Sequence, residues 1–242
     1  WLGIQVESGK PVWEFETHKS EVLYLCLEDT YARIQSRLYQ ITDEAPPELR
    51  IATTSFQIGN GLEQQIEQYL SDFPKTKLVI INTFQKVRDS KSTGGKSGMY
   101  AGDYDDVSAL KNISDKYVIA VVVVHHVRKL KDVSDPFNEV SGSTGITGAA
   151  DTNFVLKRNR ANETGTLLAT GRDIAYQELT LKFDNHSHLW ELVERKDMED
   201  IHREEIPKLV FRLVDYISEV KEWRGTATEL LTQVNETEIT PN

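Results

Sequence analysis

The chain has 242 residues, 39% of them hydrophobic and 27% charged, as in an ordinary globular protein with one sizeable core. No apolar run reaches the roughly 20 residues of a membrane-spanning helix, and the opening segment from Trp1 lacks the pattern of a signal peptide. A single cysteine, Cys26, excludes an internal disulfide framework and favours the cytoplasm. It lies in an aliphatic run, which favours a small buried side chain over a catalytic thiol.

The net charge of −10 argues against a surface covered in nucleic acid, because phosphate contacts require Lys and Arg. By composition alone, a protein that does not bind nucleic acid is favoured. A local basic channel remains open, and its best sources are Lys86-Val87-Arg88 and Arg128-Lys129-Leu130-Lys131.

The first half of the chain alternates apolar runs with helical patterns, which is typical of a mainly parallel sheet covered on both faces. Val22–Leu27 predicts a strand, and the spacing of Tyr31, Ile34 and Leu38 predicts a helix after it. A second helix is predicted over 60–73, with Asn60 as its N-cap and Glu63 at N3.

The aliphatic runs Leu78–Ile81 and Val118–Val124 predict two adjacent central strands, both buried on two faces. Between them lie a Gly/Ser/Lys-rich stretch, 89–102, and a helix marked by Val107, Leu110 and Ile113. The predicted fold class is α/β with a mainly parallel central sheet.

Beyond Asp151 the pattern changes to short strands joined by polar turns, which predict antiparallel hairpins at one edge of the sheet. They cover 152–157, 166–170, 178–183 and 189–193. A helix follows over 204–222, and Thr226 with Glu229 fits a capping box that opens another. We expect a core over 1–195 and a small helical appendage over 196–242.

Polar residues follow three of the predicted strands. Glu28 is either a general base or an incidental neighbour of an N-cap at Asp29 or Thr30. Asn82 stands where a Walker B strand ends in an acid that organises Mg²⁺, but it is a neutral amide. Alone, such a strand end is more often only a strand and turn.

The pair His125-His126 follows the Val118–Val124 strand, and cations come next. Adjacent histidines on a strand point to opposite faces, and no Cys/His/Asp cluster completes a metal site. A phosphate sensor is the better interpretation, and a partly buried polar strand end is the alternative.

Two Gly-rich segments resemble nucleotide-binding loops. Ser141–Gly148 lacks the Gly-Lys-Ser/Thr ending, and Gly94-Gly95-Lys96-Ser97 has Ser90 where the leading glycine belongs and no apolar helix after it. Neither qualifies as a P-loop.

Five segments resemble the RepA-like AAA ATPases and occur in the same order as in that family. They are Val22–Asp29, Leu78–Thr83, His125–Lys129, Gly142-Ser143 to Asp151, and Thr170–Asp173. The RepA-like AAA ATPases are RecA-fold hexameric helicase domains of plasmids, phages and mobile elements. The similarity extends to about Glu194, and the segment from Trp1 resembles the helix that follows the family's P-loop.

The resemblance implies a homo-oligomeric ring, hexameric in the family, that uses ATP and Mg²⁺ on single-stranded DNA. Glu28 would be the catalytic base, His126 the γ-phosphate sensor and Arg172 an arginine finger. Asn82, Thr83 and His125 would lie at the nucleotide, with Asn82 at the metal position. The implied DNA-binding residues are Lys86, Arg88, Arg128, Lys129 and Lys131.

Since the given residues hold no P-loop, we expect them to bind ATP weakly by themselves. Two rival functions remain: a RecA-fold DNA-binding or initiator scaffold with impaired catalysis, favoured by Asn82, and an unrelated α/β enzyme with a histidine-based site. The segment Trp223–Leu231 resembles the start of a winged-helix-like appendage.

Overall fold

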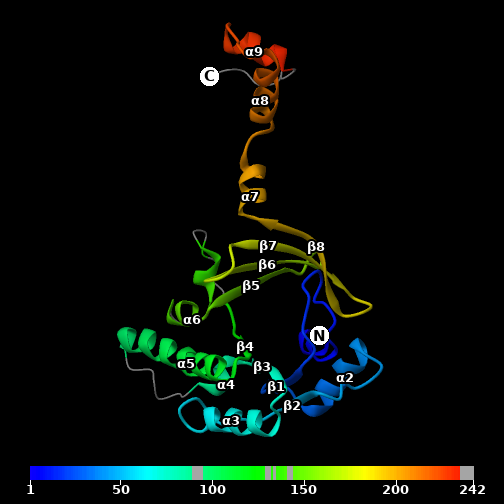
Figure 1. Ribbon diagram of the computed structural model, residues 1–242, viewed down its shortest axis with the longest axis vertical. Helices are drawn as coiled ribbons and strands as arrows, with labels where there is room; N and C mark the ends of the chain where they lie inside the picture. Colours follow the sequence, from blue (N-terminus) through cyan, green and yellow to red (C-terminus); the bar gives the residue numbers. More distant parts are fainter. Residues whose placement is uncertain (89–94, 129–131, 133–134, 141–143, 235–242) are drawn as a thin grey trace. The chain divides into compact units, whose positions relative to one another are not determined.

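The computed structural model describes residues 1–88, 95–128, 132, 135–140 and 144–234 (Figure 1). The chain forms two compact units, Trp1–Arg195 and Lys196–Asn242. None of the helices in the described ranges is long and apolar enough to cross a membrane.

A parallel sheet occupies the first unit. Its strands are β1 (Glu21–Cys26), β2 (Leu49–Ala52), β3 (Thr76–Asn82) and β4 (Ala120–Val124), in the order β2-β1-β3-β4. All three pairings are parallel, so the carboxyl ends of the strands share one edge of the sheet.

Helices cover both faces of this sheet, as the predicted α/β fold class requires. On one face, α3 (Leu62–Asp72) and α5 (Gly95–Tyr117) bury their apolar side chains against Leu23, Leu25, Val79 and Ile81. On the other, α1 (Leu2–Ser8) lies so close that a Cβ at Gly3 would be 3.2 Å from Leu49 and 3.5 Å from Val22. The helix α2 (Tyr31–Ile41) begins at the N-cap Thr30, whose side chain accepts from the Arg33 backbone N–H.

The last strand of this sheet differs from the prediction. β4 is adjacent to β3, as expected, but it is the edge strand of the described sheet rather than a central one. Val118 is 77% exposed and has a positive φ of 51°, so the strand begins only at Ala120. Val121 and Val123 face the core while Val124 is exposed, so the strand is not buried on both faces.

The second half of the first unit is an antiparallel sheet in consecutive order. It contains β5 (Thr152–Asn159), β6 (Thr164–Gly171), β7 (Gln177–Asp184) and β8 (Leu189–Asp197). In the part of the chain that the structure describes, these strands form their own sheet, with Val155, Leu168, Leu179 and Leu181 buried in it.

Several local boundaries also differ from the sequence pattern. α5 begins at Gly95, inside the Gly/Ser/Lys-rich stretch, and α6 (Thr144–Ala149) lies within the Gly-rich segment. The N-cap of α3 is Gly61 rather than Asn60, and the Glu63 carboxylate accepts from the Gly59 backbone N–H at 2.8 Å. Two further short helices are α4 (Phe84–Val87) and the 3-10 helix η2 (Pro136–Glu139).

The second unit contains α7 (Met198–Glu205), α8 (Lys208–Val220) and α9 (Ala227–Gln233). One helix over 204–222 was expected, but it is interrupted before Lys208, because Pro207 has no backbone N–H to continue it. The capping box of Thr226 and Glu229 at the start of α9 is confirmed.

Candidate functional site

The register of the parallel sheet brings three strand ends together. Cys26 on β1 pairs with Asn82 on β3, and Asn82 pairs with Val124 on β4. The residues that follow these positions therefore meet at one edge of the sheet, which is where open α/β sheets bind their ligands.

Glu28 and Thr83 are in direct contact at this edge. The Thr83 hydroxyl donates to a Glu28 carboxylate oxygen at 3.1 Å. Thr83 is 2% exposed, whereas Glu28 is exposed, so a buried hydroxyl holds a carboxylate that solvent can reach. The peptide bond between Asn82 and Thr83 is cis. Thr30 caps α2, and Glu28 has a contact of its own rather than being only a neighbour of the cap.

Asn82 is held by a residue that the sequence pattern did not single out. Its Nδ2 donates to the Tyr24 hydroxyl oxygen at 2.9 Å. Burial raises the pKa of Tyr24 to about 12, so the phenol stays protonated at neutral pH. The sequence did hold a signal for this contact: Tyr24 lies in an otherwise aliphatic run, and the hydroxyl of a partly buried tyrosine usually has a hydrogen-bond partner.

The two histidines occupy different environments. His125 is half-buried and packs edge-on against the buried Phe84 ring, with centroids 5.5 Å apart. His126 is exposed, and its ring centroid lies 6.4 Å from that of His125. His126 is therefore more accessible than His125 to an anion from solvent.

The oxygen atoms at this edge suit a hard cation. A carboxylate, a hydroxyl and a carboxamide come from Glu28, Thr83 and Asn82, and Mg²⁺ prefers oxygen ligands. Within the described ranges, no three or more His, Cys, Asp and Glu side chains gather into a cluster. The donor set thus fits an ion held partly by waters and phosphate oxygens rather than by a protein cage.

Of the cations predicted to bind DNA, Arg88 has a structural role. It binds Asp103, which is 0% exposed, and Asp106 at 3.1 Å, and its guanidinium lies 5.4 Å from the Phe84 ring centroid. Burial raises the pKa of Asp106, and Arg88 opposes that rise. Because these contacts hold the guanidinium group inside the protein, its placement argues against DNA binding by Arg88.

The other predicted DNA-binding residues lie on α4 and in the segment that begins at Arg128. Lys86 is exposed on α4. Arg128 is exposed at the base of a loop, where its backbone N–H donates to the Glu139 carbonyl at 2.6 Å and Val127 pairs with Val140. Lys129 and Lys131, which follow Arg128 in the sequence, lie outside the described residues.

The buried Glu139 side chain fixes this loop to the antiparallel sheet, through an ion pair with Lys157 on β5 at 2.8 Å. A backbone hydrogen bond between Arg128 and Glu139 thus holds the base of the loop together, and the ion pair of Glu139 with Lys157 attaches this base to β5.

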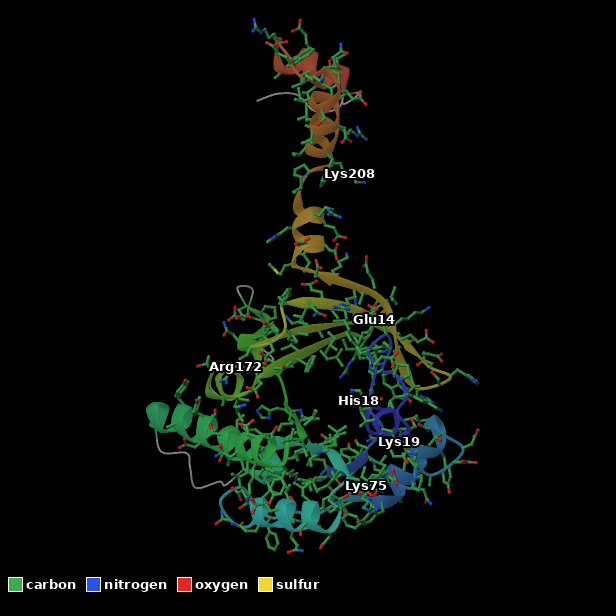
Figure 2. The ribbon with its side chains drawn as sticks, viewed as in Figure 1. Glu14, His18, Lys19, Lys75, Arg172 and Lys208 are labelled. Carbon is green, nitrogen blue, oxygen red and sulfur yellow. The ribbon has the colours of Figure 1, made fainter. Side chains whose placement is uncertain are left out.

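Arg172 follows the end of β6 (Figure 2). Its side chain is 56% exposed and forms an ion pair with Asp151 at 3.3 Å, rather than with the neighbouring Asp173. Asp151 also binds Lys111, and this hydrogen bond is the main reason that its pKa is lowered. An exposed pair of this kind contributes under about 1 kcal/mol, so Arg172 can exchange Asp151 for another anion.

A model of a protein family, described as AAA domain, matches residues 2–132, which is more than half of the chain. Among solved structures, the chain is similar to the crystal structure of the RadB recombinase. The TM-score is 0.51, with 15% sequence identity over 72% of this chain and 80% of that one. No curated protein matches. The chain has a RecA-like α/β fold and belongs to the AAA domain family.

Proposed function

We propose that the chain is the ATP-hydrolysing core of a RepA-like replicative DNA helicase or translocase, which works as a ring on single-stranded DNA. The observation that carries this proposal is the contact of Glu28 with Thr83 at the edge where Asn82 also lies. Family membership and the RecA-like fold support nucleotide hydrolysis in general, and the site residues support this particular use of it.

Glu28 is the general base in this proposal. Thr83 donates to one carboxylate oxygen, so the other can accept the proton of the water that attacks the γ-phosphate. Because Glu28 is exposed, water can reach it. A positioned base contributes about 10²- to 10⁴-fold to a reaction of this kind.

His126 and Asn82 act on the nucleotide from neighbouring strand ends. The exposed His126 imidazole donates to a γ-phosphate oxygen and distinguishes ATP from ADP. His125, packed edge-on against the Phe84 ring, positions this segment. Mg²⁺, when bound, neutralises phosphate charge, and the Asn82 and Thr83 oxygens would hold it directly or through coordinated water.

DNA contacts fall to α4 and to the segment that begins at Arg128, since the net charge of −10 leaves few basic surfaces. Lys86 and Arg128 are exposed, and Lys129 and Lys131 follow Arg128 in the sequence. Arg172 acts in trans, as an arginine finger on the nucleotide of a neighbouring subunit. The helices after 196 are proposed to begin a winged-helix-like domain.

Asn82 favours one alternative function, a RecA-fold DNA-binding or initiator scaffold. A carboxamide supplies no charge to Mg²⁺, so hydrolysis would be slow or absent while α4 and the segment that begins at Arg128 still bind DNA.

The experiment compares ATP hydrolysis with and without single-stranded DNA. It uses the protein extended at Trp1 by the Gly-x-x-x-x-Gly-Lys-Ser segment that the resemblance predicts. We expect DNA-stimulated hydrolysis that Glu28→Gln lowers at least 100-fold, because an amide cannot accept the proton. The matched control, Glu44→Gln at an exposed loop position, keeps the parent rate. DNA binding without hydrolysis would support the scaffold instead.

A further inference from the structure

A series of polar side chains leads from Asn82 along the end of β1. Tyr24 and Cys26 are two residues apart on the strand and share a face, and Cys26 pairs in register with Asn82. Asn82 Nδ2 donates to the Tyr24 hydroxyl at 2.9 Å, and this hydroxyl interacts with the Cys26 thiol. The thiol in turn donates to Asp29 Oδ2 at 3.8 Å, a weak bond of the kind that sulfur forms.

The direction of this series is fixed at its far end. Asp29 forms ion pairs with Arg33, at 3.2 Å, and with Arg37, so it is a carboxylate that can only accept. The thiol proton of Cys26 therefore points to Asp29, and the sulfur accepts from Tyr24. The Tyr24 oxygen is then left to accept from Asn82.

The acidity of the two middle groups agrees with this direction. Burial raises the pKa of Tyr24 to about 12, and the bond to Cys26 adds to that rise. Burial also raises the pKa of the Cys26 thiol. Both groups keep their protons at neutral pH, so the order of donors and acceptors does not change there.

We propose that Asp29, Cys26 and Tyr24 orient the Asn82 carboxamide so that its nitrogen is occupied and its oxygen, Oδ1, serves the Mg²⁺ of the bound nucleotide. This inference rests on the proposed function. A carboxylate would need no such device, because its two oxygens are equivalent. A carboxamide does, because only one of its two ends can face a cation. Tyr24 is thus a positioning residue, which acts through Asn82.

The first test measures the Mg²⁺ concentration that gives half-maximal ATP hydrolysis, in the protein that carries the phosphate-binding segment. We expect Tyr24→Phe to raise this concentration about tenfold, as the loss of a supporting partner does at other metal sites, with a smaller effect on kcat. Tyr69→Phe is the matched control. Tyr69 is another tyrosine whose pKa burial raises, but it lies on α3, away from Asn82. We expect it to leave the Mg²⁺ requirement unchanged.

A double-mutant cycle separates orientation from general damage. In an Asn82→Asp background the two oxygens are equivalent, so Tyr24→Phe should no longer change the Mg²⁺ requirement. The same tenfold shift in both backgrounds would show that Tyr24 does not act by orienting a carboxamide, and would overturn the proposal.

A third measurement needs no catalysis. The side-chain amide signals of Asn82 can be followed by ¹H–¹⁵N NMR in the 242-residue chain itself. We expect Tyr24→Phe to shift these signals and Tyr69→Phe to leave them in place. If Tyr24→Phe does not move them, the hydrogen-bonded series from Asp29 to Asn82 is wrong, while the proposed function is unaffected. If no form of the protein hydrolyses ATP, the proposed function fails, and the role of Oδ1 fails with it, whatever the NMR spectra show.

Discussion

At the scale of single residues, burial decides which of the polar groups can serve a ligand. Arg88 and Lys86 lie two positions apart and both were predicted to bind DNA. Arg88 faces inward to Asp103 and Asp106, whereas Lys86 is exposed. The sequence alone does not distinguish Arg88 from Lys86. The two aspartates are 15 and 18 positions from Arg88 in the chain, on α5, and become its partners only in the folded protein.

This difference predicts opposite effects of two substitutions. Arg88→Ala should lower the free energy of unfolding by about 3–5 kcal/mol, because it leaves buried carboxylates without a counter-charge. Lys86→Ala should change it by less than about 0.5 kcal/mol and weaken DNA binding instead. Urea denaturation and DNA titration at fixed salt measure the two effects. Equal stability of the two variants would show that the Arg88 pairs are not important for the fold.

At the scale of elements, the sequence was most informative where the pattern is local. The strand ends at Asn82 and Val124, the start of α2 beyond Glu28 and the capping box at Thr226 all follow from side chains within a few positions of each other. The edge position of β4 did not follow. An aliphatic run shows that a strand has buried neighbours, but not how many strands lie beside it.

The capping box predicts how α9 responds to a small change. Thr226→Ala should destabilise this helix by about 1 kcal/mol, because the Thr226 side chain accepts from the Glu229 backbone N–H. Thr228→Ala is the control, because Thr228 lies inside the same helix and its side chain does not form the capping bond. Hydrogen exchange of the α9 amides measures the difference. Identical exchange in both variants would mean that the box does not stabilise α9.

At the scale of the whole molecule, the fold class and the grouping of strand ends could be predicted because parallel strands align their carboxyl ends. The proposed positioning role of Tyr24 could not be predicted, since it depends on the register between β1 and β3. The proposed ring mechanism depends on Arg172, which is exposed and weakly paired.

The most direct measurement is DNA-stimulated ATP hydrolysis by Arg172→Ala, in the protein that carries the phosphate-binding segment, alone and mixed with a variant that lacks the P-loop lysine. Alone, Arg172→Ala should bind ATP and fold as the parent does, but lose about 10³-fold or more in turnover. Mixing should restore part of the activity, because some interfaces then combine an intact nucleotide site with an intact Arg172. Hydrolysis by Arg172→Ala at the parent rate, or no recovery on mixing, would contradict the ring mechanism.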